Sequence, residues 1–414
     1  MNDKSNPTKL EQAPRVSGAG FRLGHAFGVE IRIDWSLLII FALIAGELGL
    51  AVFPSWHADW HPALIWATAL AAALCFFASI LAHELSHAIV ANARGIPVRT
   101  ITLFLFGGIA QLEGEPDSPK SEFLIAIVGP LTSLVIGVSA TAAAVWLAGD
   151  PLRAAAASGD LVATHAALTL LGPGATLLLW LGPINVMLAI FNVIPGFPLD
   201  GGRVLRSVLW AATGNLRTAT RWAARVGQLF AWTLMALGVV EVFAGGLLSG
   251  LWLLLIGWFL NNAARASYQY LLVREGLEHV PIIGVMRSTL ARVDPGLSVE
   301  RFIRDYALPS EQRNFPVEGP DGRLLGLVSL DQIDTLDHAG WETTPVARIM
   351  VPAERLTRLP ANAEAGHALQ ELMRGKVDPL VVSDGERLLG LVSRNDLLRW
   401  LNVHERAELA ARTA

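Results

Sequence analysis

Charged residues are scarce in this sequence. Asp, Glu, Lys and Arg make up 16% of the 414 residues, whereas a soluble domain carries about a quarter. The shortage is uneven, because Glu47 and Asp59 are the only acidic or basic residues between Trp35 and Ala82, while Arg, Asp and Glu are frequent from Pro281 onward. A membrane-embedded part followed by a soluble part is therefore predicted.

Other features are also missing. The single cysteine, Cys75, excludes an intrachain disulfide framework. The net charge of −4 gives no support for a nucleic-acid partner. The polar stretch that ends at Gly20 lacks the apolar core of a signal peptide, so the first hydrophobic helix is expected to remain as an anchor in the lipid bilayer.

The sequence does contain long apolar segments. A helix needs about 20 mostly apolar residues to cross the hydrocarbon core of a bilayer. Six segments satisfy this requirement, which predicts a multi-pass protein of the cell membrane. Residues 161–171 are apolar but short, and we expect them at the surface or in a re-entrant piece. The six predicted membrane segments are residues 36–53, 63–92, 121–147, 175–194, 226–243 and 248–262.

The distribution of basic residues predicts the orientation, because Lys and Arg are retained on the cytoplasmic side. Basic residues precede the first segment and lie between the second and third and between the fourth and fifth. The alternate loops hold Arg153 alone. Both termini are therefore predicted to be cytoplasmic. The basic residues on the predicted cytoplasmic side are Lys4, Lys9, Arg15, Arg22, Arg32, Arg94, Arg99, Lys120, Arg203, Arg206, Arg217, Arg221 and Arg225.

A different pattern separates the second and third membrane segments. Residues 98–112 are rich in β-branched and aromatic side chains and are interrupted by Gly107 and Gly108. This pattern favours a strand or hairpin. Non-helical backbone at membrane depth requires protein or a water-filled cavity to satisfy its hydrogen bonds, so this segment is expected to line a cavity.

The C-terminal part contains an internal repeat. Residues 321–329 and 384–393 are nearly identical, and the repeats span about 281–337 and 344–401. A repeat of this length exceeds the usual solenoid periods and favours a paired α/β module. The predicted fold is an α-helical polytopic membrane protein with a short membrane-embedded β element and a C-terminal α/β pair. Its expected parts are a cytoplasmic segment at 1–34, a six-helix domain at 35–270 and the cytoplasmic pair at 271–414.

The strongest chemical signal is the run His83-Glu84-Leu85-Ser86-His87. Residues four apart share one face of a helix. His83 and His87 can therefore hold one zinc ion, with Glu84 beside it as a proton-transfer group. Ionisable side chains inside an apolar helix are costly and usually functional.

A catalytic zinc needs a third protein ligand and one open position. The best candidate is Asp200, which follows the fourth membrane segment. Pro195, Gly196 and Pro198 are expected to break the helix there and to let the carboxylate turn inward. An ordinary helix exit capped by Asp200 is the alternative interpretation.

Together these motifs resemble the site-2 protease family of intramembrane zinc metalloproteases. The resemblance rests on His83 to His87, on the Gly107-Gly108 break, and on the run from Asn192 to Asp200. It implies a zinc ion held by His83, His87 and Asp200, Glu84 as catalytic base, and Asn192 in contact with the substrate. Ser86 stands where the family often has Gly.

The C-terminal repeats resemble a cystathionine-β-synthase (CBS) domain pair, which often binds an adenine nucleotide. The second repeat has the matching element, with Ser393 and Asp396 as the expected ligand residues, whereas the first has Gln332 in the place of Asp. A purely structural or dimerising pair without a ligand is the alternative. Because such pairs commonly associate, a homodimer is expected.

The resemblance implies regulated cleavage of a transmembrane or membrane-associated regulatory protein. A substrate helix must unwind first, and we expect the strand at residues 100–106 to pair with the unwound peptide. Two other functions stay open at this point. One is a CBS-gated transporter or channel, and the other is an inactive scaffold that binds membrane partners.

Overall fold

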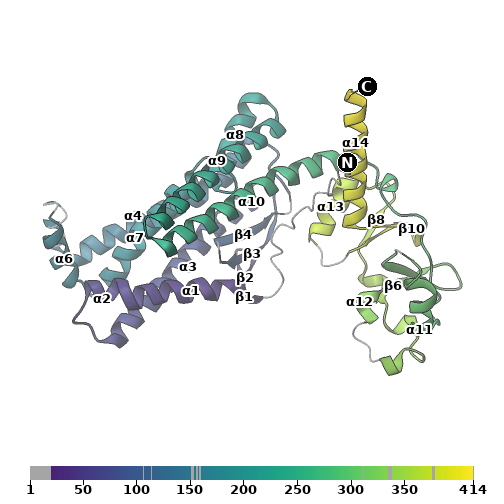
Figure 1. Ribbon diagram of the computed structural model, residues 1–414, viewed down its shortest axis with the longest axis horizontal. Helices are drawn as coiled ribbons and strands as arrows, with labels where there is room; N and C mark the ends of the chain where they lie inside the picture. The colour runs from purple at the N-terminus through teal and green to yellow at the C-terminus, as the bar shows by residue number, and fades with distance from the viewer. Residues whose placement is uncertain are drawn as a thin grey trace. The chain divides into compact units, whose positions relative to one another are not determined.

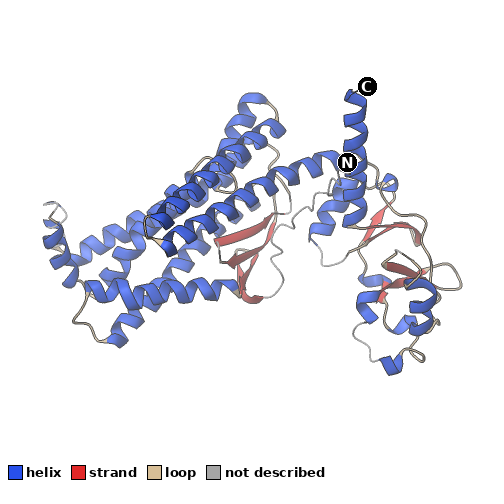
Figure 2. Ribbon diagram, in the orientation of Figure 1, coloured by secondary structure: helices blue, strands red, loops and turns tan. Residues whose placement is uncertain are grey.

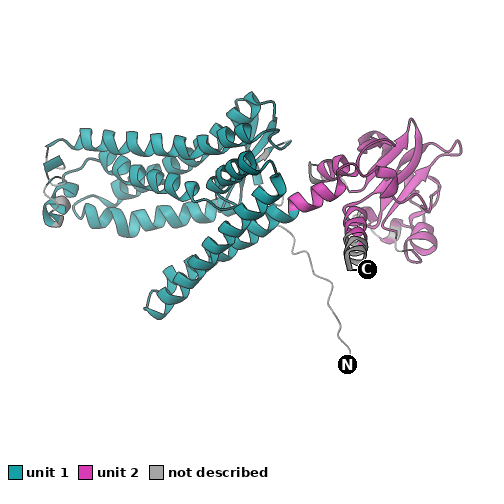
Figure 3. Cartoon of the chain, turned by 90° about the horizontal axis from the view of Figure 1, so that it is seen from above, with its two compact units in different colours: residues 1–269 teal, residues 270–414 magenta. Residues whose placement is uncertain are grey.

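The computed structural model describes the chain except for residues 1–19, 106, 113, 151–152, 155–156, 158–159, 311, 334–337, 375–377 and 414. Lys4, Lys9, Arg15 and Phe106, which carried sequence predictions, lie outside the described residues. The chain divides into two compact units, Met1–Gln269 and Tyr270–Ala414 (Figure 3).

Within the described residues, six helices are long and apolar enough to cross a membrane, as the sequence predicts (Figures 1 and 2). The first span, Ser36–Trp56, is built from α1 (Ser36–Glu47), the π-helical segment Leu48–Val52 and α2 (Phe53–Trp56). The others are α3 (Pro62–Ala93), α4 (Pro119–Ala148), α7 (Pro173–Val193), α9 (Leu216–Phe243) and α10 (Leu247–Leu277).

The last two membrane helices are longer than their apolar segments. Helix α9 begins at Leu216 instead of residue 226, so Arg217, Arg221 and Arg225 lie on the helix and not in the preceding loop. Helix α10 continues to Leu277, well beyond residue 262. Hydropathy identifies only the apolar stretch that can cross the hydrocarbon core, whereas each helix continues through more polar turns beyond that stretch.

Two shorter helices are also described in the first unit. The segment predicted as a surface or re-entrant piece forms helix α6 (Leu161–Thr169), whose N-terminus is capped by Asp160. Helix α8 (Asp200–Thr213) follows α7 after a short turn. Helix α4 packs against α3, α7 and α8. Its contact with α7 is close, because a Cβ atom added at Gly137 would lie 2.8 Å from the carbonyl oxygen of Gly182.

A four-stranded sheet lies beside α3. Its strands β1 (Gly20–Ala26), β2 (Val29–Asp34), β3 (Val98–Phe104) and β4 (Gly107–Leu112) are arranged in sequence order. Strands β2 and β3 run parallel, and the other neighbours run antiparallel. The predicted hairpin at residues 98–112 is confirmed. One face of the sheet is buried against the end of α3 through a cluster of Val29, Val98, Ile101, Ala88 and Ala91.

The sheet corrects the expectation that the strand at residues 100–106 receives the substrate. Strand β3 is paired with β2 on one side and with β4 on the other, so its backbone groups are already used. Among the described residues, the terminal strand on this side is β4. The sequence prediction failed because β1 and β2 were not recognised in the segment that precedes the first membrane helix.

The second unit contains two similar halves. The first has β5 (Asn314–Glu318), β6 (Leu324–Ser329) and β7 (Val351–Pro352), with α11 (Val299–Phe302) and α12 (Leu330–Ile333). The second has β8 (Arg358–Pro360), β9 (Leu380–Asp384) and β10 (Arg387–Val392), with α13 (Ala365–Arg374) and α14 (Arg394–Thr413).

The halves exchange short segments. Strand β7, which lies in the second sequence repeat, pairs with β6 of the first. In return, Arg287 of the first repeat forms an isolated bridge with Leu391 of β10 in the second. The corresponding glycines have matching surroundings. A Cβ atom at Gly326 would lie 2.9 Å from the sulfur of Met350, and one at Gly390 would lie 2.9 Å from the sulfur of Met286. The internal repeat seen in the sequence is thus a structural repeat.

Candidate metal centre

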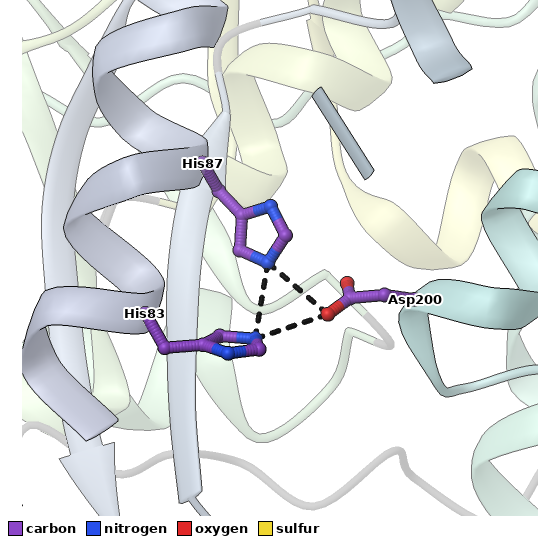
Figure 4. A group of neighbouring side chains, drawn as sticks. All are labelled: His83, His87 and Asp200. Atoms are coloured by element: carbon purple, nitrogen blue, oxygen red, sulfur yellow. Dashed lines mark hydrogen bonds and ion pairs between the residues drawn. The ribbon is translucent and has the colours of Figure 1, made fainter. Parts of the chain in front are cut away.

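Two histidines of α3 point the same way from consecutive turns of the helix (Figure 4). The Nε2 atoms of His83 and His87 lie 3.2 Å apart, and both side chains are buried. This follows from the spacing of four residues, which places both imidazoles on one face.

Asp200 reaches the histidines from the start of α8 (Figure 4). Its Oδ2 atom lies 3.0 Å from His83 Nε2 and 3.1 Å from His87 Nε2. An ionised carboxylate in the first turn of a helix is favoured by the helix dipole. Burial opposes ionisation, but the imidazoles of His87 and His83 hold the pKa of the Asp200 carboxyl well below its usual range.

Glycines make the turn between α7 and α8 tight enough for this approach. A Cβ atom at Gly201 would lie 2.2 Å from the carbonyl oxygen of Val193, and one at Gly202 would lie 2.3 Å from the backbone nitrogen of Phe197. A side chain at either position would push α8 away from the end of α7. The Pro- and Gly-rich run therefore sets the position of Asp200. Its carboxylate makes no capping hydrogen bond to α8 and instead faces the two histidines.

The far side of each imidazole is held by α4. His83 Nδ1 lies 2.9 Å from the hydroxyl of Ser133, and His87 Nδ1 lies 2.6 Å from the carbonyl oxygen of Ile125. Such contacts fix the ring orientation of metal-binding histidines. Because a carbonyl oxygen only accepts hydrogen bonds, Nδ1 of His87 must carry a hydrogen.

This tautomer indicates what lies between the three residues. A neutral His87 presents a lone pair on Nε2, so it can donate a hydrogen bond to Asp200 only when the ring is charged, whereas a metal ion at this point would accept that lone pair. A single proton cannot satisfy Asp200 and both imidazoles, whereas one cation can attract all three donor atoms. Tetrahedral ligands with zinc bonds of 2.0–2.1 Å are about 3.3 Å apart, close to the separations of 3.0–3.2 Å found here. The donor set fits zinc and leaves one position open.

Gly129 of α4 makes room for the donor atoms. A Cβ atom at this position would lie 2.1 Å from His87 Nε2 and 2.6 Å from His83 Nε2. Even the smallest side chain would therefore occupy the space where the three donor atoms converge. Gly129 was not singled out from the sequence, although the Gly129-Pro130 pair marks a position at which a membrane helix can bend.

Glu84 is half-buried on the neighbouring side of α3, against strand β4. A Cβ atom at Gly108 would lie 2.4 Å from the Glu84 side chain and 3.0 Å from its Oε1. The edge strand thus approaches the predicted base directly. The absence of a side chain at Gly108 permits that approach.

Asn192 lies near the end of α7, eight residues before Asp200 in the sequence. Its amide nitrogen donates a hydrogen bond to the carbonyl oxygen of Leu188, 3.0 Å away on its own helix. A contact between this amide and a substrate would require that hydrogen bond to be exchanged.

The second unit contains the other predicted site. The Asp396 side chain is buried. Its Oδ2 atom accepts from the backbone nitrogen of Ser393 at 3.0 Å and from its hydroxyl at 2.5 Å. The Asp396 nitrogen in turn contacts the Ser393 hydroxyl at 3.3 Å. This is the reciprocal pattern of a capping box at the start of α14. The Oδ1 atom accepts from Arg287 Nε at 2.6 Å, so both carboxylate oxygens are engaged.

We expect Gly129→Ala to reduce metal binding about tenfold or more, because its methyl group overlaps the donor atoms. The measurement is metal content per chain after equilibration of the purified protein with zinc. Gly46→Ala is the matched control, since a Cβ atom at Gly46 of α1 meets nothing within 4 Å. Full zinc occupancy in Gly129→Ala would contradict the arrangement described.

Comparison with known proteins places these features in a family. Residues 71–234 match peptidase family M50, and residues 346–403 match the CBS domain. The chain is 34% identical over 389 residues to a Mycobacterium tuberculosis protein named as a zinc metalloprotease, Rip3, covering 93% of this chain and 94% of the relative. It is 34% identical over 384 residues to sll0528 of Synechocystis, also named as a zinc metalloprotease, covering 92% and 95%.

A solved site-2 protease from Methanocaldococcus jannaschii is 25% identical, with a TM-score of 0.39, and the match covers 60% of this chain and 95% of that one. The similarity to Rip3 extends over both units and favours a peptidase over a transporter. The chain belongs to peptidase family M50, the site-2 protease family, as a multi-pass membrane zinc metallopeptidase with a C-terminal CBS domain.

Proposed function

We propose that His83, His87 and Asp200 hold one zinc ion, and that Glu84 is the base in hydrolysis of a peptide bond within a membrane-embedded segment. The observation that carries this proposal is the convergence of three donor atoms, all within 4.8 Å of one another, from α3 and α8. Zinc bound there would polarise the scissile carbonyl and make a coordinated water more acidic.

The chain's own residues supply the proton transfers and the positioning. The Glu84 carboxylate accepts a proton from the attacking water, whose oxygen bonds to the carbonyl carbon. Glu84 then delivers that proton to the leaving amine as the carbon–nitrogen bond breaks. Asn192 exchanges its hydrogen bond to Leu188 for one to the substrate and holds the peptide near the reacting carbonyl.

The substrate must be extended before it can be cut, because a helix hides its carbonyl groups in internal hydrogen bonds. The outer edge of β4 offers backbone donors and acceptors for such a peptide. Gly108 brings this edge against Glu84. Strand addition at β4 therefore presents an unwound segment to the base, which is the role first expected for the strand at residues 100–106.

The substrate class follows from the site's position in a six-helix membrane unit. We infer a transmembrane or membrane-associated regulatory protein that is cut near the cytoplasmic face. The same proposal includes cytoplasmic termini. The basic residues that precede the first, third and fifth membrane segments support this orientation.

The CBS pair is proposed to regulate cleavage by binding an adenine nucleotide near Ser393 and Asp396, and to associate as a homodimer. Ribose binding has to displace Arg287 from Asp396, because that guanidinium occupies Oδ1. The capping box explains both residues without a ligand, since Gln332 accepts from the Ser329 nitrogen at 3.0 Å in the first repeat. Nucleotide binding therefore needs its own test.

Glu84→Gln is expected to keep zinc and the fold while cleavage falls by about 10²–10⁴-fold, because the amide cannot accept the proton. Membrane proteomics of cells with either form identifies the substrate as a full-length protein that accumulates with Glu84→Gln. Glu47→Gln, another change in a membrane helix, is the control. Unchanged cleavage by Glu84→Gln would reject Glu84 as the base.

Proline substitutions in β4 test strand addition. In an antiparallel pair, successive N–H groups alternate between the partner strand and the free edge. One of Ile109→Pro and Ala110→Pro therefore removes an outward donor and is expected to slow cleavage without loss of zinc. Zinc content and cleavage are measured on the same preparations. Wild-type cleavage by both variants would exclude pairing at β4.

Asp396→Asn is expected to weaken binding of a fluorescent ADP analogue to the full chain by about tenfold, because a charged acceptor is lost. Gln332→Ala is the matched control, since it removes the corresponding capping group from the first repeat. Thermal unfolding separates capping from binding. Sensing by this site is rejected if the analogue does not bind the wild type, or binds Asp396→Asn equally well.

A further inference from the structure

A buried ion pair joins α4 to α8 at one end of the candidate metal centre. Glu122 in the first turn of α4 is fully buried, and the Arg206 side chain on α8 is 11% exposed. Arg206 Nε donates to Glu122 Oε1 at 2.5 Å, and the Nη2 atom of Arg206 contacts the same oxygen. Neither residue belongs to the motifs from which the site was predicted.

Arg206 also contacts the turn that leads to Asp200. Its guanidinium carbon lies 5.3 Å from the ring centroid of Phe197. Phe197 is buried and packs with Ala223 and Ala224 of α9, and its backbone nitrogen donates to the Ala223 carbonyl. Arg206 is therefore held between a carboxylate of α4 and a ring fixed by α9.

One face of α4 serves all three proposed ligands. Glu122, Ile125, Gly129 and Ser133 follow one another at spacings of three and four residues, so they share a helix face. Ile125 and Ser133 contact the imidazoles, and Gly129 leaves room for the donor atoms. Glu122 extends this face to Arg206, which lies on the helix that begins with Asp200.

A gain in stability does not explain this pair well. Removing two charges from water costs more than their attraction usually returns. The second Glu122 oxygen, Oε2, is buried and has no hydrogen-bond partner among the described residues, which adds to the cost. What the pair does provide is a fixed orientation of the Arg206 side chain, because a guanidinium held by a carboxylate and an aromatic ring has little conformational freedom.

We propose that the Glu122–Arg206 pair positions Asp200 as the third zinc ligand by fixing α8 against the face of α4 that holds the histidines. This inference rests on the zinc site proposed above. Glu122 and Arg206 are positioning residues, since they act through α8 and touch no donor atom of the site.

The test uses full-length protein in detergent, with Glu122→Gln, Arg206→Met and the double variant. Zinc affinity is measured by competition with a chelator, and ligand geometry by the visible absorption of the cobalt-substituted protein. Arg225→Met is the matched control, because Arg225 also stacks on a ring, that of Trp222 at 5.5 Å, on α9 instead of α8.

We expect each single variant to lose about tenfold or more in zinc affinity, as is typical for residues that support metal ligands. The cobalt spectrum should change in band position or intensity, and Arg225→Met should match the wild type. The double variant, which buries no charge, should regain thermal stability but not zinc affinity. This variant decides the matter if the single variants fail to fold.

The positioning role is rejected if both single variants keep wild-type zinc affinity and cobalt spectrum, or if the double variant regains affinity together with stability. His83→Ala separates this result from failure of the zinc site. If His83→Ala abolishes zinc binding while the pair variants bind normally, only the positioning inference fails. If His83→Ala binds zinc like the wild type, the proposed zinc site fails as well.

Discussion

The convergence of Asp200 with His83 and His87 is the constraint on which the first unit depends. The three residues come from helices far apart in the sequence, and a carboxylate at 3.0–3.1 Å from two imidazoles tolerates little error. Helix α4 resolves this problem, because it contacts the histidines through Ile125 and Ser133 and packs against α8. A single helix thus contacts both the histidines of α3 and the helix that begins with Asp200. Its small residues allow these elements to approach closely.

Glycine supplies the necessary space in several places. Gly129 faces the donor atoms, Gly108 faces Glu84, and Gly201 and Gly202 allow α8 to turn back closely after α7. None of these four glycines has a positive φ. They matter because a side chain would not fit there, and not because the backbone needs their conformational freedom. This distinction matters because alanine, usually a mild substitution in a helix, is severe at such positions.

Much of this arrangement could be predicted from sequence. The zinc-ligand spacing of His83 and His87 follows from helix periodicity alone, and the Pro- and Gly-rich run marked Asp200. The contacts of Ser133 and Ile125 could not be predicted, because they depend on the register of α4 against α3. The hairpin of β1 and β2 was missed because its turn lacks the usual Asn-Gly signature: Phe27 occupies a positive φ of 52°.

The free edge of β4 has a consequence for solvent. Backbone groups without partners are not tolerated in hydrocarbon, so a β4 edge at membrane depth would need water or a paired peptide beside Glu84. Hydrolysis consumes water, and a lipid-enclosed enzyme must obtain it from somewhere. The strand that we propose recruits an extended peptide would thereby also keep the second reactant close to Glu84.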